Sequence, residues 1–185
     1  MSTVTSADGT IIDYDAYGNG PTVIFIGGAS QHRAIDQRTT EIAKQLAAEG
    51  FTAVDYDRRG RDRSGDTPPW SLDREVEDVA ALIEATGAPA ALYTSSSGAG
   101  IALAAVTEGL DVSALALYEP IPTGAAAGPL SPFPPSSTPE TSPSLPGLPE
   151  AADAVAAALP NAQRHVLSGQ GQGECSASHN GPLAG

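Results

Sequence analysis

The chain has 185 residues, 41% of them hydrophobic, and this composition suits one globular domain with or without a tail. Its 22 acidic and 9 basic residues give a net charge of −13, which argues against nucleic acid and anionic membranes as partners. A single cysteine, Cys175, excludes an internal disulfide and a Cys-rich metal site. The sequence has no apolar run of membrane-spanning length and no secretion signal, so a cytoplasmic location is expected.

Strands and helices are predicted to alternate in the first two thirds of the chain. Short runs of apolar and β-branched residues predict six strands, at 3–6, 10–17, 22–27, 51–56, 90–94 and 112–118. Helical periodicity predicts three helices, at 38–49, between Ser71 and Gly87, and at 97–108. The run at 22–27 is continuously apolar, which is typical of a strand buried on both faces. The predicted fold class is α/β: a doubly wound, mostly parallel sheet with helices on both faces.

The composition of the chain changes sharply near residue 120. Ten of the 16 prolines lie between Pro120 and Pro149, and such a run has too little apolar surface to fold compactly. Four segments are therefore expected: a core at 1–121, a Pro-rich flexible linker at 122–149, a helix plus last strand at 150–169, and a disordered tail at 170–185.

The turn after the predicted strand at 90–94 carries the main chemical signal. In a nucleophile elbow, a serine lies on a tight strand-to-helix turn with a small residue two positions away on each side. Ser96 occupies the serine position and Gly98 one small position, whereas Thr94 stands where glycine is preferred. The following helix points its N-terminal amides at the serine, so Ser97 would supply an oxyanion N–H. The alternative is that the serines of this turn only cap the helix.

Several pieces of the core occur together in a family's order and spacing. They are an opening hairpin at 8–14, a strand with a Gly-Gly loop at 23–29, a strand with a glycine-rich turn at 55–65, the elbow at 94–98, and a strand at 114–120. As a set, they make residues 5–121 resemble the α/β-hydrolase family, in particular lid-bearing bacterial hydrolases of the actinobacterial type. The resemblance implies a serine hydrolase acting on small esters, lactones or related acyl substrates. It also implies a second oxyanion N–H from Ala29, after Gly27 and Gly28.

The resemblance does not supply an obvious catalytic base. In this family, the base is a histidine that follows the last strand, and the matching place here holds Gln172 or Gly171, neither of which can act as a base. A glutamine cannot accept the serine proton, so His179 in the tail is the expected base. His32, after the Gly-Gly loop, and His165, in the predicted last strand, are the alternatives.

The catalytic acid is expected to be Glu119. Most family members carry the acid after the strand that follows the lid, and that strand has no counterpart here. A minority carry it after the strand before the lid, where this chain has Glu119. Asp153, on the exposed side of a predicted helix, is the alternative.

An alternating charged run at 55–63 is expected to form a salt-bridged loop and not a metal site. Its acidic residues, Asp55, Asp57 and Asp62, each have an arginine nearby. No phosphate-binding loop or dinucleotide fingerprint is present, so neither a metal nor a cofactor is expected.

Three functions remain open at this point. The first is an active serine hydrolase with a small-molecule ester-like substrate. The second is a truncated or catalytically impaired homologue, because the lid, one strand and the loop histidine are not found. The third is a non-catalytic binding or interaction module, for which the Pro-rich linker is a conceivable partner ligand. The sequence leaves the oligomeric state open.

Overall fold

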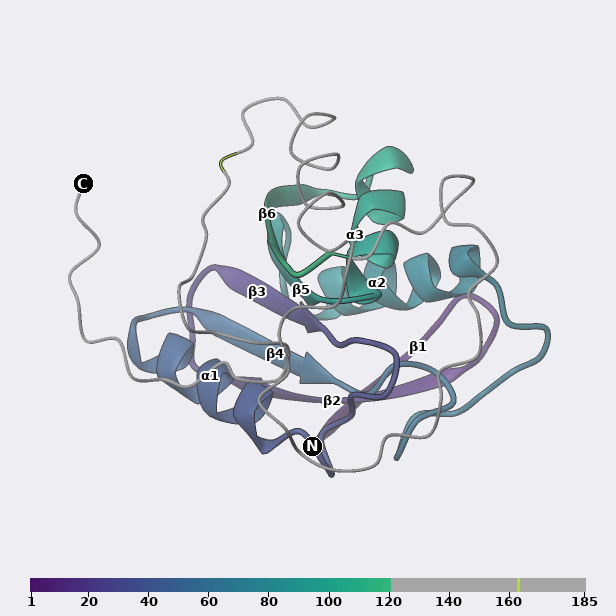
Figure 1. The fold of residues 1–185 in the computed structure, drawn as a ribbon, viewed down its shortest axis with the longest axis horizontal. Coiled ribbons are helices and arrows are strands. Elements are labelled where there is room, and N and C mark those ends of the chain that lie inside the picture. The colour runs from purple at the N-terminus through teal and green to yellow at the C-terminus, as the bar shows by residue number, and fades with distance from the viewer. Residues whose placement is uncertain (121–162, 164–185) are drawn as a thin grey trace.

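The computed structural model describes residues 1–120 and residue 163 (Figure 1). The predicted linker, last helix and tail lie outside the described residues, and so does the predicted strand at 163–167 apart from its first residue, which is exposed and in no regular element. Six strands and three helices make up the described part: β1 (Ser2–Thr5), β2 (Ile11–Tyr17), β3 (Thr22–Ile26), α1 (Gln37–Ala48), β4 (Thr52–Tyr56), α2 (Leu72–Thr86), β5 (Ala90–Ser95), α3 (Gly98–Thr107) and β6 (Val112–Tyr118). Each predicted element of the core is found, with bounds that differ by no more than one residue.

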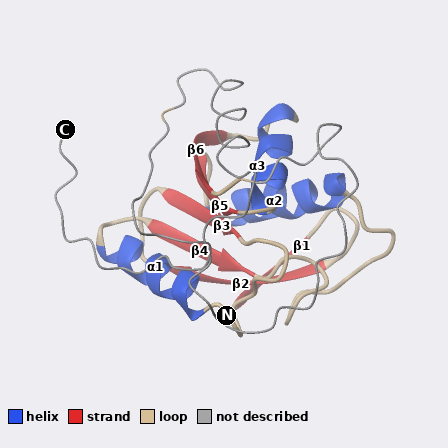
Figure 2. Ribbon diagram, in the orientation of Figure 1, coloured by secondary structure: helices blue, strands red, loops and turns tan. Residues whose placement is uncertain are grey.

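The strands form one sheet in the order β1-β2-β4-β3-β5-β6 (Figure 2). The pairs β1–β2 and β2–β4 are antiparallel, whereas β4, β3, β5 and β6 run parallel to one another. The predicted mostly parallel α/β sheet is thus confirmed. Because β6 pairs only with β5, it borders the described part of the sheet.

The helices cover both faces of the sheet, with α2 and α3 packed together on one face and α1 on the other (Figure 1). Strand β3 is continuously apolar in sequence because both of its faces are buried. Ile24 and Ile26 point into the core under α2 and α3, whereas Phe25 packs with Ala43 of α1 on the opposite face. Successive side chains of a strand alternate between faces, so a strand buried on both needs an apolar residue at every position.

Local capping fixes where the helices begin. The Ser71 side chain accepts a hydrogen bond from the Arg74 N–H, and Asp36 accepts one from the Thr39 N–H before α1. Such caps stabilise a helix by about 1 kcal/mol each. Helix α2 then ends at Gly87, whose φ of 114° suits a residue without a side chain.

The carboxyl ends of the parallel strands meet at one edge of the sheet. Gly27 follows β3, Asp57 follows β4, Ser96 follows β5 and Glu119 follows β6. In open α/β sheets, ligands bind at this edge, because the loops there are free to vary while the strands fix their positions. The fold therefore gathers four sequence-distant segments where a site is expected.

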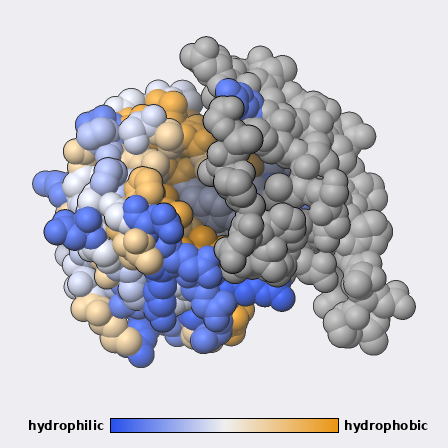
Figure 3. Space-filling view, turned by 90° about the vertical axis from the view of Figure 1, so that its left-hand side faces the viewer, coloured by the Kyte–Doolittle hydropathy of each residue, from blue (hydrophilic) through white to orange (hydrophobic). Residues whose placement is uncertain are grey.

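The surface is mixed in character. On the face shown in Figure 3, hydrophilic residues dominate the lower part and hydrophobic residues gather nearer the centre. None of the helices in the described part of the chain has the length and apolar character needed to cross a membrane.

A buried carboxyl on β4 should make the stability of the fold depend on pH. Burial raises the pKa of Asp55 to about 6, even though the Thr40 hydroxyl donates a hydrogen bond of 2.8 Å to it. The folded protein therefore holds this proton more tightly than the unfolded chain does. The free energy of unfolding should fall by about 3 kcal/mol as the pH rises from about 4 to about 6, and then stay level. Urea unfolding of Asp55→Asn across this range should lack that fall.

The matched control is Asp111→Asn, which removes the same charge from an exposed position. It should keep the pH dependence of the unmodified chain. An equal flattening in both variants would contradict the assignment to Asp55.

Candidate active site

Ser96 lies on a strained turn between β5 and α3. Its φ is 49°, in the left-handed region that residues with a side chain rarely adopt. Only Asp62 and Glu119 share this property among the non-glycine residues that the structure describes. The Ser97 side chain makes no capping hydrogen bond to α3, so a simple helix cap does not account for this serine-rich turn. Strain of this kind persists where the surrounding structure enforces it, and it is concentrated at functional sites.

Gly98 lets α3 begin directly against the end of β3. A Cβ at this position would lie 2.4 Å from the Ile26 carbonyl oxygen and 3.1 Å from that of Gly27. No side chain fits in such a space, which explains the small residue required on this side of the elbow. On the other side, Thr94 is fully buried in the sheet, where it is paired with Ile26 and Leu117. The turn therefore tolerates a residue larger than the preferred glycine there.

The Gly-Gly loop after β3 touches the elbow. A Cβ on Gly28 would lie 3.2 Å from the Ser96 Cβ and 3.5 Å from the Ser95 carbonyl oxygen. Ala29, the next residue, is exposed beside the turn. Among the described residues, no hydrogen bond uses the backbone N–H of Ala29 or of Ser97. Two unengaged N–H groups thus come from segments that meet at the elbow.

Gln31 ties the loop to the elbow through its side chain. Its Oε1 atom accepts hydrogen bonds from the Gly28 N–H and from the Ser95 hydroxyl. Its Nε2 donates to Asp36, the cap of α1, over 2.8 Å. One amide side chain therefore joins the loop after β3 and the cap of α1 to the end of β5, and no sequence motif pointed to it.

Glu119 stands beside Ser96 on the neighbouring strand end. Strands β5 and β6 pair in parallel with Ser95 opposite Tyr118, and the Ser96 N–H donates a 3.0 Å hydrogen bond to the Tyr118 carbonyl. Glu119 follows at once, with a φ of 45°. The structure thus brings Ser96, Ser97, Ala29 and Glu119 to one edge, while His179, Gln172, His165 and Asp153 lie outside the described residues.

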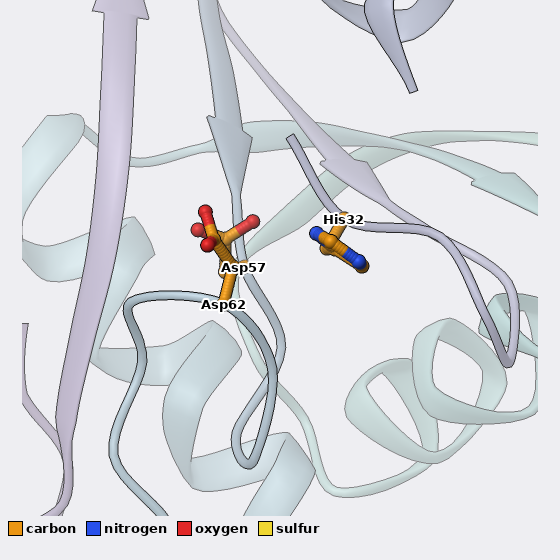
Figure 4. A group of neighbouring side chains, drawn as sticks. All are labelled: His32, Asp57 and Asp62. Carbon is orange, nitrogen blue, oxygen red and sulfur yellow. The ribbon is translucent and has the colours of Figure 1, made fainter. Parts of the chain in front are cut away.

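His32 approaches two carboxylates at the same edge (Figure 4). One ligand atom each from His32, Asp57 and Asp62 lies within 4.8 Å of the others. Arg33 already occupies Asp57, with its Nε at 3.1 Å and a terminal nitrogen at 2.7 Å from Oδ2. A cation at this group would have to displace that guanidinium. The His32 Nδ1 is buried and has no hydrogen-bond partner among the described residues.

The charged run after β4 is salt-bridged. Its arginines reach carboxylates elsewhere in the chain: Arg58 bonds to Glu75 and Arg59 to Asp78, each at 2.7 Å. Arg59 also bonds to Asp8 at 2.8 Å and, through its hydrogen bond, holds the pKa of that carboxyl well below its usual range. The expected salt bridges are therefore present, and their carboxylate partners lie on α2 and in the N-terminal hairpin.

Comparisons with known proteins identify the family to which this fold belongs. Residues 23–180 match the model of a family described as the alpha/beta hydrolase family. The fold is similar to a solved alpha/beta hydrolase from Sphaerobacter thermophilus, with 47% sequence identity and a TM-score of 0.59 over 64% of this chain and 45% of that chain. It is also similar to an esterase from Exiguobacterium antarcticum, with 23% identity and a TM-score of 0.57 over the same shares. An epoxide hydrolase from Vigna radiata, at 21% identity, gives a TM-score of 0.56 over 63% of this chain and 37% of that one.

The matched part of the chain spans less than half the length of each of these solved structures. The two similarities below 25% identity concern the fold alone. A comparison with proteins of curated function gave no match.

The contact at Gly98 yields a stability prediction. Gly98→Ala would place a methyl group against backbone atoms of β3, which cannot move aside as a flexible side chain can. Overpacking of this kind costs about 1–3 kcal/mol, and chemical denaturation should show a loss in that range. Gly65→Ala is the control, because its nearest contacts are at 3.5 Å and its φ is not in the left-handed region. It should change the stability by less than about 1 kcal/mol. Equal effects of the two substitutions would contradict the close approach.

Proposed function

The chain belongs to the alpha/beta hydrolase family, and from this premise we propose that it is a serine hydrolase that cleaves small esters, lactones or related acyl substrates. The observation that carries the proposal is the left-handed φ of Ser96 at a strand-to-helix turn that has room only for glycine two residues later. A strained serine at this place in the fold is the arrangement of a nucleophile elbow.

In the proposed reaction, the Ser96 Oγ attacks the substrate carbonyl carbon while its proton passes to a base. The carbonyl oxygen becomes negatively charged, and the N–H groups of Ala29 and Ser97 stabilise it. Both are unengaged among the described residues, and α3 adds the positive end of its dipole. The bond to the leaving alcohol then breaks as the proton is returned to that oxygen. Water hydrolyses the resulting acyl-enzyme by the same steps.

We assign the base to His179 and the acid to Glu119. The backbone pairing of β5 with β6 supports Glu119, because it lies next to Ser96 at the strand ends. A carboxylate there can orient a histidine and stabilise its charged form. His179 is chosen because the place that matches the family histidine holds Gln172 or Gly171.

That same glutamine favours a second candidate, a catalytically impaired homologue. Without a base, a positioned serine and an oxyanion hole still give about 10³–10⁴-fold acceleration over water. Such a protein would act only on activated esters, whose leaving groups need little help from an acid.

The nucleophile is tested with a fluorophosphonate probe, which labels activated serines covalently. The full-length chain should be labelled, and Ser96→Ala should lose the label. The control is Ser113→Ala, which removes an exposed hydroxyl from β6 and should be labelled like the unmodified chain. Labelling that survives Ser96→Ala would refute Ser96 as the nucleophile.

The pH dependence of ester hydrolysis separates the two candidates. Only a neutral imidazole accepts the serine proton, so a histidine base makes the rate rise through a pKa near 6.5 and then level off. His179→Ala should remove this inflection. An impaired protein should show no inflection, and its rate should climb steadily with hydroxide concentration.

A further inference from the structure

We propose that Arg61 is a positioning residue for the oxyanion hole: it holds the Gly28 carbonyl and thereby directs the Ala29 N–H. The kinetic consequence rests on the proposed function, whereas the effect on the loop does not. Arg61 lies in the turn after β4, more than thirty residues away in sequence from the loop that it contacts.

Two guanidinium groups bind the carbonyl oxygens of this loop. A terminal nitrogen of Arg61 lies 2.6 Å from the Gly28 oxygen and 3.5 Å from the Gln31 oxygen. Arg58 donates to the Gly27 oxygen at 3.1 Å and to the Gly28 oxygen at 3.4 Å. The Gly28 oxygen also accepts a 3.3 Å hydrogen bond from the Gln31 N–H within the loop. The Arg61 contact is the shortest of those on Gly28, and Arg58 supports it from the β3 side.

Because the peptide bond is planar, the contact with the Gly28 carbonyl also determines the orientation of the Ala29 N–H. The peptide between Gly28 and Ala29 is planar and trans, since the cis bonds lie elsewhere, before Pro69 and Pro89. In a trans peptide, the C=O and N–H groups point in opposite directions. Fixing the Gly28 oxygen on Arg61 therefore fixes the direction of the Ala29 N–H. A cation on the carbonyl also polarises the peptide and makes this N–H a stronger donor.

The charge environment of Arg61 sets it apart from the other inward-facing arginines. Arg33, Arg58 and Arg59 each form ion pairs with carboxylates. Among the described residues, Arg61 has no carboxylate within ion-pair distance, although the chain carries 22 acidic residues. Burial lowers the pKa of Arg61, and the charge of Arg58 lowers it further. A half-buried cation that bonds only to backbone carbonyls is costly for stability, which points to a role in shaping the loop.

Arg58 is unsuitable as the test position because it also holds the core together. Its guanidinium forms two hydrogen bonds with Glu75, at 2.7 and 3.0 Å, and Glu75 is almost fully buried. Removing Arg58 would leave that buried carboxylate without its cationic partner, with only the Trp70 N–H bonded to it among the described residues. Arg61 can be replaced without stranding a buried charge.

The experiment compares Arg61→Met with Arg63→Met in the full-length chain. Methionine is unbranched and covers the space of the arginine stem, but it carries no charge and donates no hydrogen bond. Arg63 lies in the same turn but is exposed. Its replacement by methionine changes the net charge by the same amount. The first measurement is the backbone amide NMR resonance of Ala29 and its hydrogen exchange. The second is hydrolysis of 4-nitrophenyl acetate, with kcat and KM determined separately.

Arg61→Met should shift the Ala29 amide resonance and speed its exchange, whereas Arg63→Met should leave both unchanged. Arg61→Met should also lower kcat about 10- to 100-fold and keep KM within about twofold of its original value, because an oxyanion donor acts mainly in the transition state. Arg61→Lys, which keeps one cationic donor, should be intermediate and serves as the test variant if the methionine variant fails to fold. An unchanged Ala29 resonance in a folded Arg61 variant would overturn the proposal.

The two measurements also separate this proposal from the proposed function. If the unmodified chain shows no hydrolysis that depends on Ser96, the proposed function fails, and the Ala29 resonance alone decides the role of Arg61. If hydrolysis depends on Ser96 but kcat is the same in Arg61→Met, the role of Arg61 is refuted while the proposed function stands.

Discussion

The close approach of α3 to the end of β3 is the constraint on which the rest of the site depends. A hypothetical Cβ on Gly98 would lie 2.4 Å from the Ile26 oxygen, so the helix can begin there only because that residue is glycine. Because the helix starts so close to the strand, the chain has to turn within Ser96 and Ser97, and Ser96 takes a left-handed φ. The same approach sets the elbow against the Gly-Gly loop. The strain at Ser96, the position of the N-terminus of α3 and the contact with the loop are thus linked to one packing contact.

Buried arginines support the loop beside this contact. Burying a guanidinium group costs free energy unless a carboxylate pairs with it, and the chain has a net charge of −13. Carboxylates are abundant, so Arg58 and Arg59 can be buried with Glu75 and Asp78 as partners. Breaking such pairs leaves a buried charge alone, which is strongly destabilising. The glycine-rich turn after β4 is therefore anchored to α2, and Arg61 is carried on this anchored turn to the loop after β3. In the described part of the chain, Arg58, Arg59 and Arg61 are buried or half-buried, and each donates to a backbone carbonyl oxygen.

The sequence predicted the core elements well, and the reason is that their signals are local. The apolar run of β3, the Ser71 cap and the Gly87 stop each depend on neighbouring residues only. The resemblance implied that Ala29 and Ser97 serve one oxyanion hole, and the parallel pairing of β3 with β5 brings the two segments together. The partners in the ion pairs of the charged run could not be predicted from the sequence. Arg58 lies in the turn after β4 and its partner Glu75 lies in α2, so their contact depends on the tertiary fold and on the direction of both side chains. Gln31 was missed for a similar reason, because the Ser95 hydroxyl that bonds to it lies 64 residues away in the sequence.

The elbow is held from its other side by β6, and this has a consequence for the proposed oxyanion hole. The Ser96 N–H donates to the Tyr118 carbonyl at 3.0 Å, so it is not available to a substrate. The next N–H along the chain, that of Ser97, has no partner among the described residues and belongs to the first turn of α3. A helix leaves its first N–H groups unsatisfied by its own geometry, and a ligand can take them up. In the proposed mechanism, the donor after the nucleophile is therefore selected by strand pairing: β6 occupies one amide and leaves the following one for the oxyanion.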